Sequence, residues 1–176
     1  MIQFSNSNIE IADEADIMSI VKLLNSAYRG ERSKKGWTTE AHIIAGDRRT
    51  DAADLKQLMQ QPGSVFLKYT SESEITGCVN LQYHNRKIYL GMLSVSPNLQ
   101  GGGLGKQLLS AAEEYTRYVE CYIIYMSVIS VRSELIDWYK RHGYLETGER
   151  KPFIEDELTG KHLQPLEFII LQKELL

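Results

Sequence analysis

Residues 100–106 read Gln-Gly-Gly-Gly-Leu-Gly-Lys, and this glycine-rich stretch decides which fold we expect. Its four glycines let backbone N–H groups face one way without obstruction by a Cβ atom. Apolar residues then recur at helical spacing, namely at Leu104, Leu108, Ala111, Ala112, Tyr115 and Val119. The loop therefore opens a helix, at the end where free amides and the helix dipole attract phosphate.

The spacing of this loop excludes two common phosphate-binding motifs. A P-loop needs glycine, four residues and then Gly-Lys-Ser/Thr, but Gln100 and Gln107 occupy its end positions. A dinucleotide fingerprint would need a glycine at position 106 or 108, where Lys106 and Leu108 stand. The pattern that is left is Gln-x-x-Gly-x-Gly. Glycine in the first turn of a helix costs up to ~1 kcal/mol relative to alanine, which favours a bound ligand over a bare turn.

The N-terminal segment predicts a strand followed by a helix. Residues 9–11 form the short strand. Asp13 then caps a helix that runs to about Tyr28, and Asp16 stands at the capping-box position. Residues 29–36 are polar and flanked by glycine, so we expect a loop there.

A second helical region and three strands come before the glycine loop. One helical stretch begins at Trp37, and a helix around residues 55–59 ends at Pro62. Three strand-like runs follow, at residues 65–69, 75–83 and 88–95. Their short connections predict an antiparallel meander.

The remaining elements close the sheet. A strand at residues 122–128 follows the helix after the loop, so it should run parallel to the strand at residues 88–95. Ser133 caps a short helix that stops at His142 and Gly143. Two final strands lie at residues 144–147 and 166–172. The expected order is β–α–α–β–β–β–α–β–α–β–β, an α/β (α+β) fold.

Composition narrows the class of protein. The chain has 176 residues, and we expect residues 1–176 to form one domain. Its net charge of −3 argues against a nucleic-acid or anionic-membrane partner. Cys78 and Cys121 stand apart without a Cys-x-x-Cys spacing, as free thiols do in a reducing compartment. With neither a signal peptide nor a long apolar run, we expect a cytoplasmic protein without a membrane partner.

The chain resembles the GNAT superfamily of N-acetyltransferases in three features. The Gln-x-x-Gly-x-Gly loop matches its acyl-CoA pyrophosphate motif, and residues 91–97, Gly-Met-Leu-Ser-Val-Ser-Pro, match its fourth strand. Residues 135–144 match a later pattern in which Tyr139 stands four residues before a Gly-aromatic pair. The element order agrees as well, so the resemblance covers nearly the whole chain. It implies a mixed, mostly antiparallel sheet flanked by helices, with parallel fourth and fifth strands that splay apart.

The resemblance also implies a cofactor site for acetyl-CoA. Pantetheine would enter between the splayed strands and bind backbone groups of Leu93 and Val95, as an added strand does. Pyrophosphate would lie on the amides from Gly101 to Lys106, and the Lys106 side chain either adds charge or is solvated. The cofactor residues that we predict are Leu93, Ser94, Val95, Gln100, Gly101, Gly102, Gly103, Leu104, Gly105, Lys106 and Arg132.

The same resemblance implies a direct attack by a neutral amine on the thioester. Backbone N–H groups near Leu93 would stabilise the oxyanion, and Tyr139 would protonate the departing thiolate. Members often carry Asn seven residues before this Tyr, where this chain has Arg132. That arginine would reach phosphate or the acceptor, or else face solvent.

The base and the acceptor site are less well defined by sequence. The fourth strand carries no acid, so Glu40 and His84 are the candidates to take the amine proton. Tyr28, Trp37 and Glu40 would wall the acceptor site, where aromatic rings and a carboxylate suit an ammonium group. The loop at residues 153–157 is a further candidate to approach the acceptor, although such an acidic run is more often solvated. No histidine has a metal-ligand spacing, so no metal is expected.

The sequence therefore favours an acetyl-CoA-dependent N-acetyltransferase acting on a small-molecule or peptide amine. The alternative is a protein that keeps the fold as a non-catalytic acyl-CoA sensor or interaction module. A homodimer is compatible with the resemblance.

Overall fold

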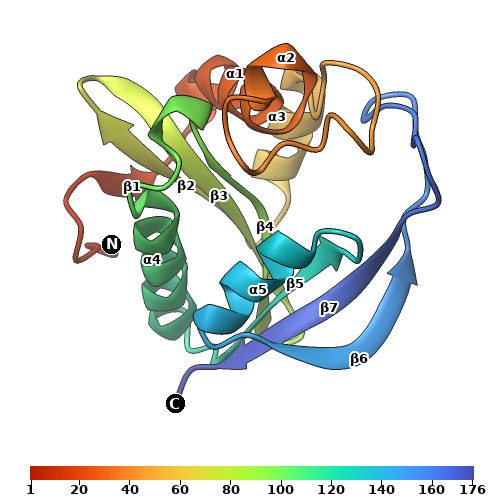
Figure 1. Cartoon of the computed structure of the whole chain (residues 1–176). Coiled ribbons are helices and arrows are strands. Elements are labelled where there is room, and N and C mark those ends of the chain that lie inside the picture. The colour runs from red at the N-terminus through yellow and green to blue at the C-terminus, as the bar shows by residue number, and fades with distance from the viewer.

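A seven-stranded sheet forms the centre of the molecule, in the strand order β1-β2-β3-β4-β5-β7-β6 (Figure 1). The computed structural model describes all residues, 1–176. The strands are β1 (Ile9–Ile11), β2 (Ser64–Ser71), β3 (Glu74–His84), β4 (Lys87–Val95), β5 (Ile123–Ile129), β6 (Leu145–Pro152) and β7 (Glu167–Glu174). The helices are α1 (Ile17–Tyr28), α2 (Gly30–Ser33), α3 (Ala52–Gln60), α4 (Leu104–Tyr118) and α5 (Ser133–Arg141), with short 3-10 turns η1 (Glu14–Asp16) and η2 (Pro97–Leu99).

Strands β4 and β5 are parallel, and all other neighbouring pairs are antiparallel. This confirms the predicted mixed sheet. The parallel pairing spans only Ile88 with Ile124 and Tyr89 with Tyr125. Beyond Tyr89 the two strands separate, so the edge of β4 that faces β5 has no strand partner from Gly91 onward. The splay that the resemblance implied is therefore present.

Helices cover both faces of the sheet (Figure 1). Helices α1 and α3 pack on one face against Phe66 and Cys78. Helices α4 and α5 pack on the other face against Leu67 and Val79. Phe66 and Leu67 are neighbours on β2, and Cys78 and Val79 are neighbours on β3. Because neighbouring residues of a strand point to opposite faces, each strand contributes to both cores. The two cysteines are buried and free, and no helix is long and apolar enough to cross a membrane.

Local signals placed most elements correctly. Asp13 accepts a hydrogen bond from the Ala15 N–H at 2.8 Å, and its own N–H donates to Asp16 at 2.9 Å, which confirms the capping box. Strand β6 runs to Pro152, further than the predicted 144–147, because it pairs with β7 along the sheet edge. Helix α5 begins at Ser133 with Arg132 as its N-cap and has no side-chain cap bond, so the predicted Ser133 cap is wrong.

The connection between α1 and α3 differs from the prediction. Residues 29–36 contain the single turn α2, where we expected only a loop. The helix predicted from Trp37 does not form, because the Trp37 and Thr38 N–H groups donate to the Gln100 side chain, at 2.8 and 3.3 Å. The N–H of Glu40 donates to the carbonyl of Tyr28 at 2.9 Å instead of continuing a helix. Long-range contacts thus override the local helical pattern here.

Candidate active site

A cavity of about 500 Å³ opens where β4 and β5 separate. The end of β4, the glycine loop, the 37–38 segment and one face of α5 line it. It brings together the predicted residues Tyr28, Trp37, Leu93, Val95, Gln100, Gly101, Gly103, Leu104, Gly105, Lys106 and Tyr139. Residues that lie up to 111 positions apart in the sequence therefore meet at one site.

The glycine loop leaves its backbone open to the cavity. Gly101 and Gly103 have φ angles of +88° and +83°, a left-handed conformation that glycine adopts without strain. A Cβ atom on either residue would meet no atom within 4 Å, so space lies beside both. Gly103 is the N-cap of α4, and no side chain caps the helix. The first amides of α4 are therefore available to an anion.

Gln100 organises this loop through its side chain. Its amide nitrogen donates to the Val95 carbonyl at 3.0 Å and to the Thr38 hydroxyl at 2.8 Å. Its amide oxygen accepts the N–H groups of Trp37 and Thr38. A Cβ atom at Gly36 would lie 2.3 Å from that oxygen, so only glycine lets the amide come so close. Gln100 thus ties the 36–38 segment to the end of β4.

A second, smaller cavity of about 120 Å³ lies beside the first. Tyr28, Leu93, Leu135 and Tyr139 line both cavities and form their shared wall. The Tyr28 hydroxyl donates to the Leu93 carbonyl within this wall. The smaller cavity adds Glu40, Arg49, Arg132, Phe153 and Phe168, together with apolar residues of β4 and β5.

Tyr139 is one of two tyrosines in the shared wall. Only 6% of the residue is exposed, and its ring lies 5.0 Å from Trp138 and 5.8 Å from Tyr144. Burial raises the pKa of Tyr139, and the nearby Tyr28 and Tyr89 raise it further. The phenol therefore keeps its proton at neutral pH and can donate a hydrogen bond.

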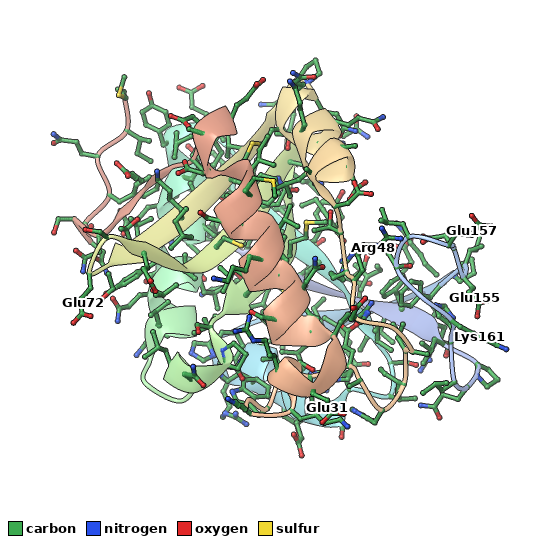
Figure 2. All side chains as sticks on the ribbon, turned by 90° about the horizontal axis from the view of Figure 1, so that it is seen from above. Glu31, Arg48, Glu72, Glu155, Glu157 and Lys161 are labelled. Atoms are coloured by element: carbon green, nitrogen blue, oxygen red, sulfur yellow. The ribbon has the colours of Figure 1, made fainter.

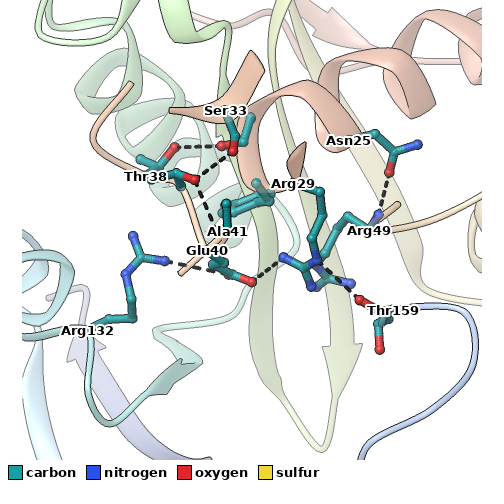
Figure 3. Close-up of polar contacts among 12 residues, drawn as sticks. Asn25, Arg29, Ser33, Thr38, Glu40, Ala41, Arg49, Arg132 and Thr159 are labelled. Atoms are coloured by element: carbon teal, nitrogen blue, oxygen red, sulfur yellow. Dashed lines mark hydrogen bonds and ion pairs between the residues drawn. The ribbon is translucent and has the colours of Figure 1, made fainter. Parts of the chain in front are cut away.

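Glu40 lies between two buried arginines (Figure 3). Arg29 is 2% exposed, and its Nη1 lies 2.5 Å from Glu40 Oε2 while its Nε donates to the Thr159 carbonyl at 3.2 Å. Arg132 is 7% exposed, and its Nη1 lies 3.7 Å from Glu40 Oε1. Burial lowers the pKa of Arg29, and Glu40 opposes that shift. Burial is the main cause that raises the pKa of Tyr28, and the Glu40 carboxylate raises it further.

Several predicted residues lie away from the expected position. Arg132 lines the smaller cavity with Glu40 and not the larger one, because it precedes α5 on the far side of Tyr139. Ser94 is buried with its hydroxyl on the Met92 carbonyl at 3.2 Å, and it lines neither cavity. Gly102 does not line the larger cavity either.

The proposed acceptor and base residues divide between the two cavities. Trp37 lines the larger cavity, 6.3 Å from the Trp138 ring, so it does not share a wall with Glu40 as predicted. His84 is exposed at the end of β3 and lines neither cavity, so the structure does not bring this base candidate to the site.

The loop after β6 contributes to the smaller cavity through one residue. Phe153 lines that cavity and stacks on Phe168 at 4.4 Å. Glu155 and Glu157 are exposed on the loop (Figure 2), and the Glu155 carboxylate accepts the His162 N–H at 2.7 Å. The acidic run is therefore solvated, and Phe153 is the part of the loop that reaches the site.

Sequence reasoning missed one face of α5. Leu135, Trp138 and His142 line the larger cavity, and the Trp138 and His142 rings lie 4.4 Å apart. Their i, i+3 and i+7 spacing follows one helical stripe, which was a usable signal. No group of three or more His, Cys, Asp or Glu side chains could hold a metal ion.

The chain belongs to the GNAT acetyltransferase family, since the model of the acetyltransferase (GNAT) domain matches residues 40–159. No curated protein matches the chain in sequence. Solved structures agree with the fold. A ribosomal-protein-alanine N-acetyltransferase from Brucella melitensis has 19% identity and a TM-score of 0.70, over 95% of this chain and 99% of that one.

Two further structures are similar in fold. One, from Salmonella typhimurium, was determined with its cofactor acetyl-CoA and has 21% identity and a TM-score of 0.68, over 97% of this chain and 95% of that one. The other, a GNAT-family acetyltransferase from Staphylococcus aureus, has 16% identity and a TM-score of 0.68, over 96% and 99% of the two chains.

Proposed function

We propose that the chain is an acetyl-CoA-dependent N-acetyltransferase that transfers acetyl to a primary amine in a ternary complex. One observation carries this proposal. A single cavity joins the uncapped amides of α4, the strand-free edge of β4 and the Tyr139 hydroxyl. An acyl-CoA needs these three parts for its pyrophosphate, its pantetheine and its thioester. The acetyl-CoA complex of the Salmonella protein supports the choice of cofactor.

The cofactor would lie along the larger cavity. Pyrophosphate would accept hydrogen bonds at the start of α4, where the helix dipole favours an anion and Lys106 adds a positive charge. Pantetheine would add to the free edge of β4 near Leu93 and Val95, where backbone groups lack a partner strand. The carbonyls of these two residues already accept from Tyr28 and Gln100, so each would use its second lone pair.

The chemistry would take place at the wall that both cavities share. The amine nitrogen attacks the thioester carbon from the smaller cavity, forms the C–N bond and expels the thiolate as the C–S bond breaks. Tyr139 donates a hydrogen bond from its hydroxyl to the sulfur as the thiolate forms, since its raised pKa keeps the hydroxyl protonated. The amine must lose a proton, and Glu40 is the carboxylate of the smaller cavity that could receive it.

Acetyl-CoA titration tests the first half of this proposal. At a ligand concentration about 100 times Kd, the folded state gains about 2.7 kcal/mol, which raises Tm by roughly 5–10 °C for a chain of this size. A folded, CoA-free sample that does not bind acetyl-CoA would contradict the proposal. Release of free CoA on addition of amines would exclude the non-catalytic sensor.

The variant Glu40→Gln tests the base. If Glu40 receives the proton, kcat falls by about 100-fold while the affinity for acetyl-CoA is kept. If Glu40 only holds Arg29 and Arg132, the KM of the amine rises and kcat is kept. The matched control is Glu31→Gln, because Glu31 is exposed and pairs only with Lys34.

A further inference from the structure

The smaller cavity contains a buried arginine that lacks a hydrogen-bonded anionic partner. Arg132 is 7% exposed, and its Nη1 is buried without a hydrogen-bond partner. The only carboxylate near it is Glu40, 3.7 Å away, which is beyond hydrogen-bond distance. A buried guanidinium nitrogen without an acceptor is costly, and native proteins seldom leave one. A ligand that carries an anionic oxygen would satisfy it.

The other charged groups near Arg132 do not neutralise the excess of positive charge in this cavity. Arg29 lies closer to Glu40, at 2.5 Å, and takes up its second oxygen (Figure 3). Arg49 also lines the cavity, and its backbone N–H donates to Asn25 Oδ1 at 2.6 Å. Two arginines therefore share one buried carboxylate, and a third, Arg49, lines the same cavity. Asp156 lies nearer the surface, where its carboxylate accepts from Thr159 and solvent screens it.

The rest of the cavity is small and apolar. Twelve of its seventeen lining residues are hydrophobic, which include the rings of Phe153, Phe168 and Tyr89. Its volume of about 120 Å³ equals that of roughly four water molecules at ~30 Å³ each. A compact molecule fits within this cavity, whereas a peptide, a polyamine or an aminoglycoside would have to extend out of it. A polyamine would also bring ammonium groups against the arginines.

We propose that the acceptor is a free amino acid with a small apolar side chain, whose carboxylate binds Arg132 and Arg49. The inference rests on the proposed function, because it names the amine that this site acetylates. The guanidinium of Arg132 would hold the carboxylate by charge-assisted hydrogen bonds. The α-amine then points to the shared wall of Leu93 and Tyr139, and the side chain lies against Phe153 and Phe168.

Matched acceptors separate the carboxylate from the rest of the molecule. L-Alanine and L-valine are compared with alaninamide and valinamide, with CoA release as the readout. The amides keep size and shape but lack the anionic group. We expect kcat/KM to be at least about 100-fold higher for the acids, because a site built for a charged group strongly rejects an analogue without it.

The variant Arg132→Gln assigns the discrimination to this side chain. We expect it to lower kcat/KM for the acids by about 100-fold, to leave the amides within about threefold, and to keep the acetyl-CoA affinity. Arg132→Lys should restore part of the loss, since it returns the charge without the planar fork. Arg48→Gln is the control, because Arg48 is an exposed arginine outside both cavities (Figure 2).

The outcomes separate this inference from the proposed function. Equal turnover of acids and amides would overturn the amino-acid acceptor and leave the N-acetyltransferase intact. Loss of acetyl-CoA affinity in Arg132→Gln would assign the arginine to the cofactor and overturn the inference. Acetyl-CoA binding without turnover of any acid would overturn it as well. Absence of acetyl-CoA binding by the wild type would overturn the proposed function itself. The comparison of wild-type acceptors stands even if the variant does not fold.

Discussion

Replacement of Gln100 by alanine should loosen the wall of the larger cavity. The side chain makes four hydrogen bonds, to the Val95 carbonyl, the Thr38 hydroxyl and the N–H groups of Trp37 and Thr38. Gln100 lies 62 to 63 positions from the 37–38 segment, so its side chain joins two remote parts of the chain. The variant therefore leaves backbone donors of this segment to solvent.

The expected cost follows from these contacts. Four hydrogen bonds at a net value of about 1 kcal/mol each give an upper estimate of about 4 kcal/mol. Gln100 is only half-buried, so water replaces part of what is lost. We expect the free energy of unfolding to fall by about 2–3 kcal/mol, which lowers Tm by roughly 4–12 °C. Because Trp37 and Thr38 line the cavity, acetyl-CoA should bind about tenfold more weakly, or about 1.4 kcal/mol.

Urea denaturation and calorimetric titration with acetyl-CoA measure the two effects. Gly36→Ala should act in the same direction, because its Cβ would lie 2.3 Å from Gln100 Oε1 and displace the amide. Gln57→Ala is the control, since Gln57 is exposed on α3. A Gln100→Ala variant within about 0.5 kcal/mol of the wild type would refute the bracing role of Gln100.

Three further predictions concern the site and the core. Tyr139→Phe should lower kcat by about 10–100-fold and keep acetyl-CoA affinity, and stopped-flow kinetics that show an unchanged chemical step would exclude a general acid. Gly103→Glu should abolish acetyl-CoA binding, whereas Gly148→Glu, which has the same left-handed strain and open surroundings, should retain it in the same titration. Burial raises the pKa of the Cys78 thiol to about 12. A disulfide reagent at pH 8 should therefore label this thiol only when urea unfolds the protein. Rapid labelling of the folded protein would count against that burial.

Alkaline pH should destabilise the fold through its buried tyrosines. Burial raises the pKa of Tyr139 and Tyr144, and the Glu113 carboxylate raises that of Tyr144 further. The folded chain thus keeps protons that the unfolded chain releases above pH ~10, so stability is complete below that pH and falls as pH rises beyond it. Urea titrations between pH 8 and 11 measure the slope, and a flat profile above pH 10 would contradict it.

Local patterns in the sequence determined the elements and the glycine-loop end of the larger cavity. The capping box at Asp13, the helical stripe of α4 and the left-handed glycine after α5, with φ of +92° at Gly143, are all readable within a few residues. The resemblance that the Gln-x-x-Gly-x-Gly loop supports also implied that the loop and β4 line one site, and both line the larger cavity. These features depend on backbone conformation and on contacts within one turn or one strand, so sequence alone carries them.

The tertiary structure alone decided the partners of the polar side chains. Gln100 lines the larger cavity as predicted, but sequence did not reveal that its side chain also braces Thr38. Sequence left Arg132 to reach phosphate, the acceptor or solvent, and the structure places it beside Glu40. Glu40 and Arg132 are separated by 92 positions, and no local pattern encodes their approach. The cause is that a side chain's partner depends on how strands and helices remote in sequence pack together, whereas helix and strand formation depends on near neighbours.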